Sequence, residues 1–243
     1  MEVPDPNTSV TNLTAALLDP ILQQDPAGPR ITYYDDVSGE RIELSALTLA
    51  NWAAKTANLI RDEFGLLPGA RICVLLPAHW QSAAVLLGCW WAGAEVLLAP
   101  ADDAELALVS ADRLAEVEDA PEVAVLSLDA FGRPAEGLPV GVTDYATSVR
   151  VHGDQFRPDS GASSALDGLS IAEVLTAATD SASAQSIGRA DRVLSSSEWG
   201  TATELIEGLL ATLSVGASLV QVARPSDDAM TRRMTSEKIT IRR

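Results

Sequence analysis

The sequence predicts a layered α/β domain in which a parallel-rich sheet is flanked by helices. Two apolar runs of strand length, at residues 71–76 and 96–99, enclose a segment of helical length at 80–91. This order and these lengths are typical of a βαβ crossover. Both runs are apolar at successive positions, which indicates parallel strands that are covered by helices. Because strand and helix patterns alternate again further along the chain, the sequence favours the α/β class.

One main domain accounts for the length and the composition. A chain of 243 residues with 47% hydrophobic residues can bury one sizeable core. We expect an N-terminal arm at residues 1–30, where five prolines surround a short helix at 13–18, and a single α/β domain at 31–243. Residues 131–168 are rich in Gly, Pro, Asp and Ser, and they predict a loop-rich seam in this domain.

The domain is predicted to open with a β-hairpin and an amphipathic helix. Residues 31–35 and 41–44 have strand patterns, and the turn between them ends in Gly39. Ser45 is a suitable N-cap, and the apolar residues between 49 and 64 recur near a period of 3.6. Gly65 can end this helix because glycine adopts the left-handed conformation of a C-terminal cap.

The remaining elements are expected from their apolar patterns and lengths. In order, they are a strand at 71–76, a helix at 80–91, a strand at 96–99, a helix within 104–118, a strand at 122–127, a strand candidate at 147–152 in the seam, a helix at 171–178, a strand at 192–195, a helix at 201–213, a strand at 218–222 and a short helix within 227–243.

Charge and cysteine content restrict the class of partner and the compartment. The formal net charge is −17, so most of the surface would repel a nucleic acid. The N-terminus lacks the pattern of a secretory signal, and the longest apolar stretch, 82–94, is shorter than the roughly 20 residues that span a bilayer. Cys73 and Cys89 lie in apolar runs and predict buried, reduced thiols. We therefore expect a cytoplasmic protein with no membrane span and no nucleic-acid partner.

The order of several segments resembles a known enzyme family. Residues 31–34, 42–47, 57–60 and 65–77, continued by 86–100, resemble the opening of AMP-forming acyl-CoA synthetases and related adenylating enzymes. Residues 191–194, 209–220 and 237–240 resemble a later part of the same large domain. The chain is also similar to small stand-alone actinobacterial proteins with faint similarity to AMP-binding enzymes. The resemblance implies the fold of the first half of the large N-terminal domain of adenylate-forming enzymes.

The family binds ATP phosphates with a glycine-rich loop of the form S-G-T-T-G-x-P-K-G, and residues 160–168 stand at the corresponding place. Without gaps, Ser160, Gly161, Ser163 and Gly168 match this motif and are the candidate cofactor-binding residues. Asp167 replaces the lysine, so an attraction to phosphate becomes a repulsion. The alternative is an ordinary Ser/Gly/Ala loop with a chance similarity. The resemblance further implies that the segment for adenine and Mg²⁺, the ribose-binding aspartate and the catalytic lysine lie beyond residue 243.

Other candidate sites have simpler interpretations. Ser170 lies in a pattern like a nucleophile elbow, but a serine hydrolase needs a base, and we expect Ser170 to be the N-cap of the following helix. His79 is expected at a helix start. His152 and Asp154 have a spacing that a metal could use, but no third ligand stands near them. The sequence thus identifies no catalytic residue and no metal site.

We therefore expect a non-catalytic, regulatory or binding protein that is derived from the acyl-CoA synthetase N-terminal domain and has no obligatory cofactor. A half-domain would expose apolar faces or sheet edges, so a homo-oligomer or a protein partner is expected. The alternative is a reduced AMP-forming enzyme that a partner chain would complete, in which ATP or AMP is the cofactor. A third hypothesis retains a pocket for an acyl or nucleotide ligand without turnover.

Overall fold

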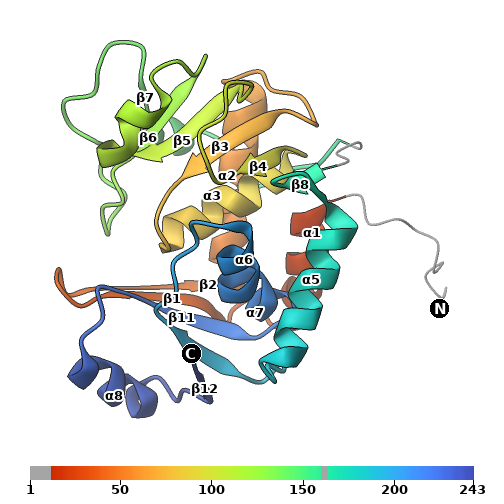
Figure 1. Cartoon of the computed structure of the whole chain (residues 1–243), viewed down its shortest axis with the longest axis vertical. Helices are drawn as coiled ribbons and strands as arrows, with labels where there is room; N and C mark the ends of the chain where they lie inside the picture. The colour runs from red at the N-terminus through yellow and green to blue at the C-terminus, as the bar shows by residue number, and fades with distance from the viewer. Residues whose placement is uncertain (1–11, 160–163) are drawn as a thin grey trace.

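The computed structural model describes residues 12–159 and 164–243, and it arranges them around two sheets (Figure 1). One sheet has seven strands in the order β7-β6-β5-β3-β4-β8-β9, and the other has five in the order β12-β10-β11-β1-β2. Neighbouring strands are parallel except in the two hairpins, β1–β2 and β8–β9. The predicted parallel-rich α/β fold is confirmed, whereas its division into two sheets was not predicted.

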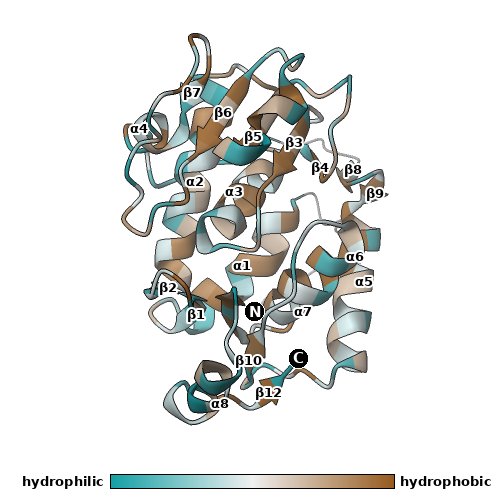
Figure 2. Ribbon diagram, turned by 60° about the vertical axis from the view of Figure 1, so that its left-hand side comes forward, coloured by the Kyte–Doolittle hydropathy of each residue, from teal (hydrophilic) through white to brown (hydrophobic). Residues whose placement is uncertain are grey.

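The seven-stranded sheet has apolar side chains on both faces. Successive side chains of β3 point to opposite faces of the sheet. Ile72 and Val74 belong to the main core, whereas Cys73 and Leu75 belong to a smaller cluster on the other face. Figure 2 shows the hydrophobic colour of β3, β5 and β6. The strands are β3 (Arg71–Leu75), β4 (Glu95–Leu97), β5 (Leu106–Ser110), β6 (Val123–Leu126), β7 (Thr143–Asp144), β8 (Ser164–Leu166) and β9 (Leu169–Ser170).

The five-stranded sheet combines the predicted N-terminal hairpin with strands from the last third of the chain. Its outer face is covered by α8 (Asp227–Ser236), whose Met230 packs against Leu194, Val220 and Val222. The strands are β1 (Pro29–Asp35), β2 (Glu40–Ser45), β10 (Arg192–Ser195), β11 (Ser218–Ala223) and β12 (Ile241–Arg242). Because β11 pairs with β1 in parallel, segments almost 190 residues apart become neighbours.

The main core lies between the two sheets, where several helices pack together (Figure 1). Trp90 is fully buried there, and its indole N–H donates to the carbonyl of Ala165 at 2.8 Å. Buried residues of this core come from α1 (Leu13–Gln24), α2 (Ala46–Asp62), α3 (Trp80–Trp91), α4 (Tyr145–Val149) and α5 (Ile171–Ala184), and also from the helical segment at 202–214. Among the residues described, no helix has the length and hydropathy of a membrane span.

Local capping signals were predicted well. Ser45, His79 and Ser170 each precede a helix and accept a backbone N–H from its first turn. Ser170 forms a capping box with Glu173, so its predicted role as an N-cap is confirmed. The helix predicted at 201–213 consists of α6 (Ala202–Leu205), a π-helical turn, η2 (Ile206–Leu210), and α7 (Ala211–Ser214).

Two predicted elements were wrong. The helix expected within 104–118 is instead β5, followed by a 3₁₀ helix, η1 (Ala111–Val117). Every residue of β5 is buried between β3 and β6, so tertiary pairing overrides the helix propensity of Ala and Leu. The strand candidate at 147–152 is instead α4, because Asp144 caps it by accepting the N–H of Thr147 at 2.7 Å. The helices predicted at 13–18 and 171–178 both extend six residues further, as α1 and α5.

Candidate functional site

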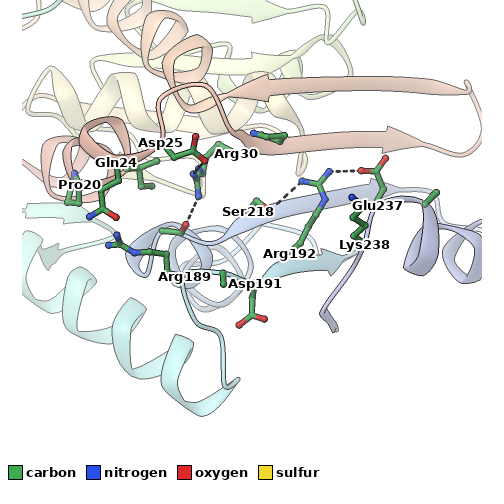
Figure 3. A pocket seen from close by; sticks show the side chains of 15 residues that line it. Pro20, Gln24, Asp25, Arg30, Arg189, Asp191, Arg192, Ser218, Glu237 and Lys238 are labelled. Carbon is green, nitrogen blue, oxygen red and sulfur yellow. Dashed lines mark hydrogen bonds and ion pairs between the residues drawn. The ribbon is translucent and has the colours of Figure 1, made fainter.

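A cavity of about 700 Å³ opens at the edge of the five-stranded sheet where β1, β10 and β11 begin (Figure 3). The first residues of these strands meet there because the strands are parallel. Four cationic side chains line the cavity: Arg30, Arg189, Arg192 and Lys238. We call it the arginine cavity. Figure 3 shows Arg30 and Arg189 on one side of it and Arg192 and Lys238 on the other.

Arg30 is the buried member of this set, with only 5% of its surface exposed. Its Nη1 donates to the carbonyls of Gly216 and Ala217 at 2.5 and 2.9 Å, and Asp25 lies 3.8 Å from Nη2. Its Nε is buried and has no hydrogen-bond partner in the described part of the chain. Burial lowers the pKa of Arg30, Asp25 opposes this effect, and the nearby positive charge of Arg189 lowers the pKa further. An arginine nevertheless stays protonated at neutral pH.

Arg192 is held in place by a network on the opposite side of the cavity. Its Nη2 donates to Glu237 at 2.5 Å and to Thr32 Oγ1 at 2.9 Å. Burial raises the pKa of Glu237, but hydrogen bonds from Tyr34, Arg192 and Arg41 outweigh this effect and lower it below its ordinary value. Glu237 is therefore ionised at neutral pH, and it compensates the charge of Arg192.

Arg189 and Lys238 are exposed at the cavity, and neither forms an ion pair with the residues that the structure describes. Three carboxylates also line the cavity, but Asp25 and Glu237 lie beside Arg30 and Arg192, and Asp191 accepts the N–H of Gly188 at 2.7 Å. The four cations exceed the three anions by one charge, in a chain whose net charge is −17. The cavity thus concentrates positive potential in an otherwise acidic protein.

The cationic residues at this cavity are suited to binding an anion. Guanidinium and ammonium groups donate charge-assisted hydrogen bonds to phosphate and carboxylate oxygens. The residues that line the described cavity include no His or Cys that could serve as a general base or a nucleophile at neutral pH. The arrangement favours an anionic ligand.

The described end of the predicted phosphate loop, residues 164–168, lies elsewhere, in the seven-stranded sheet. Ser160, Gly161 and Ser163 are outside the described residues, so the structure does not place them. Gly168 follows Asp167 in the turn between β8 and β9, and both residues have positive φ angles, of 84° and 44°. The N–H of Gly168 donates to Glu95 Oε1 at 2.7 Å, and Asp167 Oδ1 accepts the N–H of Leu98 at 3.1 Å. The assignment of these four residues to a phosphate loop stays a prediction.

The other candidate residues from the sequence form local hydrogen bonds or ion pairs. Ser170 Oγ donates to Glu173 within the capping box, at 2.7 Å. His152 lies 3.2 Å from a carboxylate oxygen of Glu63. No group of three His, Cys, Asp or Glu side chains in the described ranges is arranged to hold a metal ion. Cys73 and Cys89 are buried and form no disulfide.

The sequence patterns do not point directly to the cations of the cavity, although their positions relative to the predicted strands carry a signal. Arg30 directly precedes the strand predicted at 31–35, Arg192 begins the strand predicted at 192–195, and Arg189 lies three residues before that second strand. Parallel strands begin at the same edge of a sheet, so such residues converge if the strands are neighbours. The apolar patterns do not indicate which strands are neighbours, so they do not predict that these arginines lie close together.

Comparison with solved structures defines the class of fold. An acyl-CoA synthetase from Brucella canis matches with a TM-score of 0.80 and 19% identity, over 99% of this chain and 48% of that one. The N-terminal domain of FACL13 from Mycobacterium tuberculosis matches with a TM-score of 0.73 and 12% identity, over 96% of this chain and 62% of that one. The chain thus has the fold of acyl-CoA synthetase N-terminal domains, and it spans about half the length of the Brucella enzyme.

Sequence comparison identifies the family. No protein-family model matches the chain. The "TIGR03089 family protein" of Mycobacterium tuberculosis (strain ATCC 25618 / H37Rv) is 57% identical over 242 residues, covering 96% of this chain and 98% of the relative. The chain belongs to the TIGR03089 protein family.

Proposed function

We propose that this protein is a non-catalytic binding protein that uses the acyl-CoA synthetase-like fold to bind a phosphate-bearing small molecule in the arginine cavity. The observation that carries the proposal is the convergence of Arg30, Arg189, Arg192 and Lys238 on one cavity of about 700 Å³. Such a volume lies within the range of small-molecule sites, which are usually about 300–1,000 Å³. Arg189 and Lys238 are the side chains that would meet the ligand's phosphate.

The turn at Asp167 and Gly168 supports the non-catalytic part of the proposal. A phosphate loop works by pointing unpaired backbone N–H groups at phosphate oxygens. Here Glu95 already accepts the N–H of Gly168, so this N–H is not free to donate to a phosphate oxygen. Changing Asp167 to Lys should therefore produce no ATP binding, because the change leaves Glu95 in place.

Isothermal titration with AMP, coenzyme A and inorganic phosphate tests the binding site. The Arg189→Ala variant should bind the preferred ligand about 10- to 100-fold more weakly, because a hydrogen bond to a charged group contributes about 1.5–3 kcal/mol. Arg113→Ala is the matched control, since Arg113 pairs with Glu116 on η1 and does not line the cavity. Equal losses in both variants, or no saturable binding of any of the three probes, would contradict the proposal.

An assay of ATP-dependent pyrophosphate exchange distinguishes the binding protein from a reduced adenylating enzyme. We expect no exchange above background with carboxylic acids, either alone or with candidate partner chains. Exchange that depends on the protein and is abolished by Gly168→Ala would support the enzyme instead.

We further propose that the protein associates with a second copy or with another protein through its loop-rich seam. Phe131 and Val151 are large apolar residues that are 74% and 81% exposed. Arg150, the neighbour of Val151, donates to the carbonyl of Phe131 at 3.1 Å and so connects the two segments of the seam. Val140 of the same seam is fully exposed. Exposed apolar side chains that gather on one surface often mark an interface.

Sedimentation velocity of the isolated protein tests this association. We expect a dimer or a larger species at micromolar concentration, and the double change Phe131→Ser and Val151→Ser should shift it toward the monomer. The control is Leu67→Ser, which removes a side chain of similar exposure outside the seam. A monomer that also captures no partner through Phe131 would refute the proposal.

The state of the cysteines supports a cytoplasmic location, which we also propose. Both thiols are buried and unpaired. Burial raises the pKa of Cys73 to about 11 and also raises that of Cys89, so neither is a reactive thiolate at neutral pH.

A further inference from the structure

A second cavity, of about 330 Å³, lies at the opposite ends of the same strands, where β1 and β11 finish and β2 begins. We call it the crevice. It also reaches the residues that follow β3 and β6 in the other sheet, so it is a gap between the two sheets. Ligands of open α/β sheets bind outside the carboxyl ends of parallel strands. The side chains that matter for its chemistry are Tyr33, Glu40, His79, Glu198, Gln221 and Arg224.

His79 presents a hydrogen-bond donor to the crevice. Its Nδ1 accepts the backbone N–H of Gln81 at 3.1 Å, so the hydrogen of the neutral ring is on Nε2. Nε2 lies 3.6 Å from Glu40 Oε1, which exceeds hydrogen-bond distance. Both atoms are buried and lack a hydrogen-bond partner among the residues described. His79 itself is only 2% exposed.

Gln221 presents an acceptor to the same space. Its Nε2 donates to the carbonyl of Ser197 at 3.0 Å, which orients the amide and leaves Oε1 without a partner in the described chain. Gln221 is only 1% exposed. A buried polar atom without a hydrogen bond raises the free energy of the folded state, because folding removes its hydrogen bonds to water and provides no replacement. Three such atoms, His79 Nε2, Glu40 Oε1 and Gln221 Oε1, therefore belong to residues that line one crevice.

The charges that face the crevice are predominantly negative. Asp35 is paired with Arg224, which is the only Lys or Arg among the described residues that line the crevice. In this part of the described chain, neither Glu40 nor Glu198 forms an ion pair with a Lys or Arg side chain of the crevice. Burial, followed by the negative charges of Asp35 and Glu40, raises the pKa of the Tyr33 hydroxyl. The crevice therefore favours a cation over an anion. The donor N–H of His79 disfavours a bare metal ion, which would require a lone pair at that position.

We propose that the crevice binds a small organic ammonium compound with an oxygen atom next to its amine. The ammonium group donates to Glu40 Oε1 and Gln221 Oε1, and the oxygen accepts the hydrogen of His79 Nε2. Amino alcohols are the simplest members of this class. The site is independent of the arginine cavity, because the two lie at opposite ends of the strands and attract opposite charges.

Titration of the whole protein with ethanolamine, followed by calorimetry or by NMR chemical shifts, tests the proposal. Ethanolamine should bind with a dissociation constant in the millimolar range, as expected for so few atoms. Ethylene glycol, which replaces the ammonium group with a hydroxyl, should bind at least about tenfold more weakly. Saturable binding of ethanolamine together with this preference supports the proposal. Absence of saturable binding over the millimolar range, or equal binding of the two probes, overturns it.

Variants locate the ligand. Glu40→Gln should weaken ethanolamine binding at least about tenfold, because it removes the buried charge with little change in shape. Glu118→Gln is the matched control, since it removes the same charge from an exposed residue outside the crevice. His79→Asn retains a residue that can cap α3 and should also weaken binding. If Glu40→Gln fails to fold, Glu198→Gln, on an exposed loop position, gives the same test with a smaller effect. Unchanged binding in these crevice variants would refute the site.

Discussion

At the scale of the residue, ion pairs at strand ends make stability depend on pH. Asp35 ends β1 and is paired with Arg224, which follows β11. Burial raises the pKa of Asp35, but hydrogen bonds from Arg224 and from the N–H groups of Val37 and Ser38 lower it to about 2. The ordinary value for aspartate is about 3.9, so the folded protein holds the ionised form more strongly than the unfolded chain.

The sign of the effect follows from this depressed pKa. The stabilisation by Asp35 is complete above about pH 4 and is lost as the pH falls toward about 2. We expect Asp35→Asn to lower the free energy of unfolding at pH 7 by about 1–2 kcal/mol, a value reduced because Arg224 is largely exposed. The difference from the wild type should shrink between about pH 4 and pH 2.

Urea unfolding at a series of pH values measures this difference. Asp102→Asn is the control, because Asp102 is an exposed residue in a turn. A difference between Asp35→Asn and the wild type that stays constant down to pH 2 would show that the Arg224 pair does not act through ionisation.

At the scale of the element, a close helix contact lies between α2 and α3. Gly88 of α3 faces Thr56 of α2, and a methyl group at Gly88 would come within 2.4 Å of Thr56 Cβ and 2.9 Å of the Ala53 carbonyl oxygen. These are side-chain and backbone atoms of a packed helix, which cannot move away without separating the two helices. The absence of a side chain at Gly88 therefore sets the distance between α2 and α3.

We predict that Gly88→Ala destabilises the protein although alanine has the better helix propensity. The gain in propensity is about 1 kcal/mol, whereas overpacking of a core costs typically about 1–3 kcal/mol. Thermal and denaturant unfolding should show a net loss. Gly200→Ala is the control, because the nearest atom there is 3.6 Å away at the end of the flexible Glu204 side chain. A more stable Gly88→Ala variant would mean that α2 and α3 can move apart freely.

At the scale of the whole molecule, the two sheets share one hydrophobic core. The main cluster includes Ile31 and Leu219 of the five-stranded sheet and Ile72 and Leu108 of the seven-stranded sheet, joined through the helices between them. We predict that the chain unfolds in a single transition, as expected for one domain at residues 31–243. Circular dichroism and the fluorescence of Trp80 and Trp90 in α3 should give coincident denaturation curves. Two separated transitions would indicate that each sheet unfolds as a unit.

The helix α1 is part of this core rather than an appendage of it. Thr14 Oγ1 donates to the carbonyl of Leu87 at 2.5 Å, and Asn12 Nδ2 donates to the carbonyls of Trp90 and Trp91 at 3.1 and 3.0 Å. Leu13, Leu17 and Leu18 are fully buried or nearly so. Leu13, Leu17 and Leu18, which lie in the arm predicted at residues 1–30, therefore belong to the core.

The sequence by itself determined the features that depend on local physical chemistry. The caps at Ser45 and Ser170, the helix α3 at its predicted bounds and the strands β3 and β10 follow from neighbouring residues alone. Only the tertiary structure decided features that depend on distant partners. The apolar residues of β5 form a strand because β3 and β6 lie on either side of it. Arg30, Arg189 and Arg192 come together because β1 and β10 both pair with β11 in parallel. Periodicity records whether a residue is buried, but it does not record which neighbour buries it.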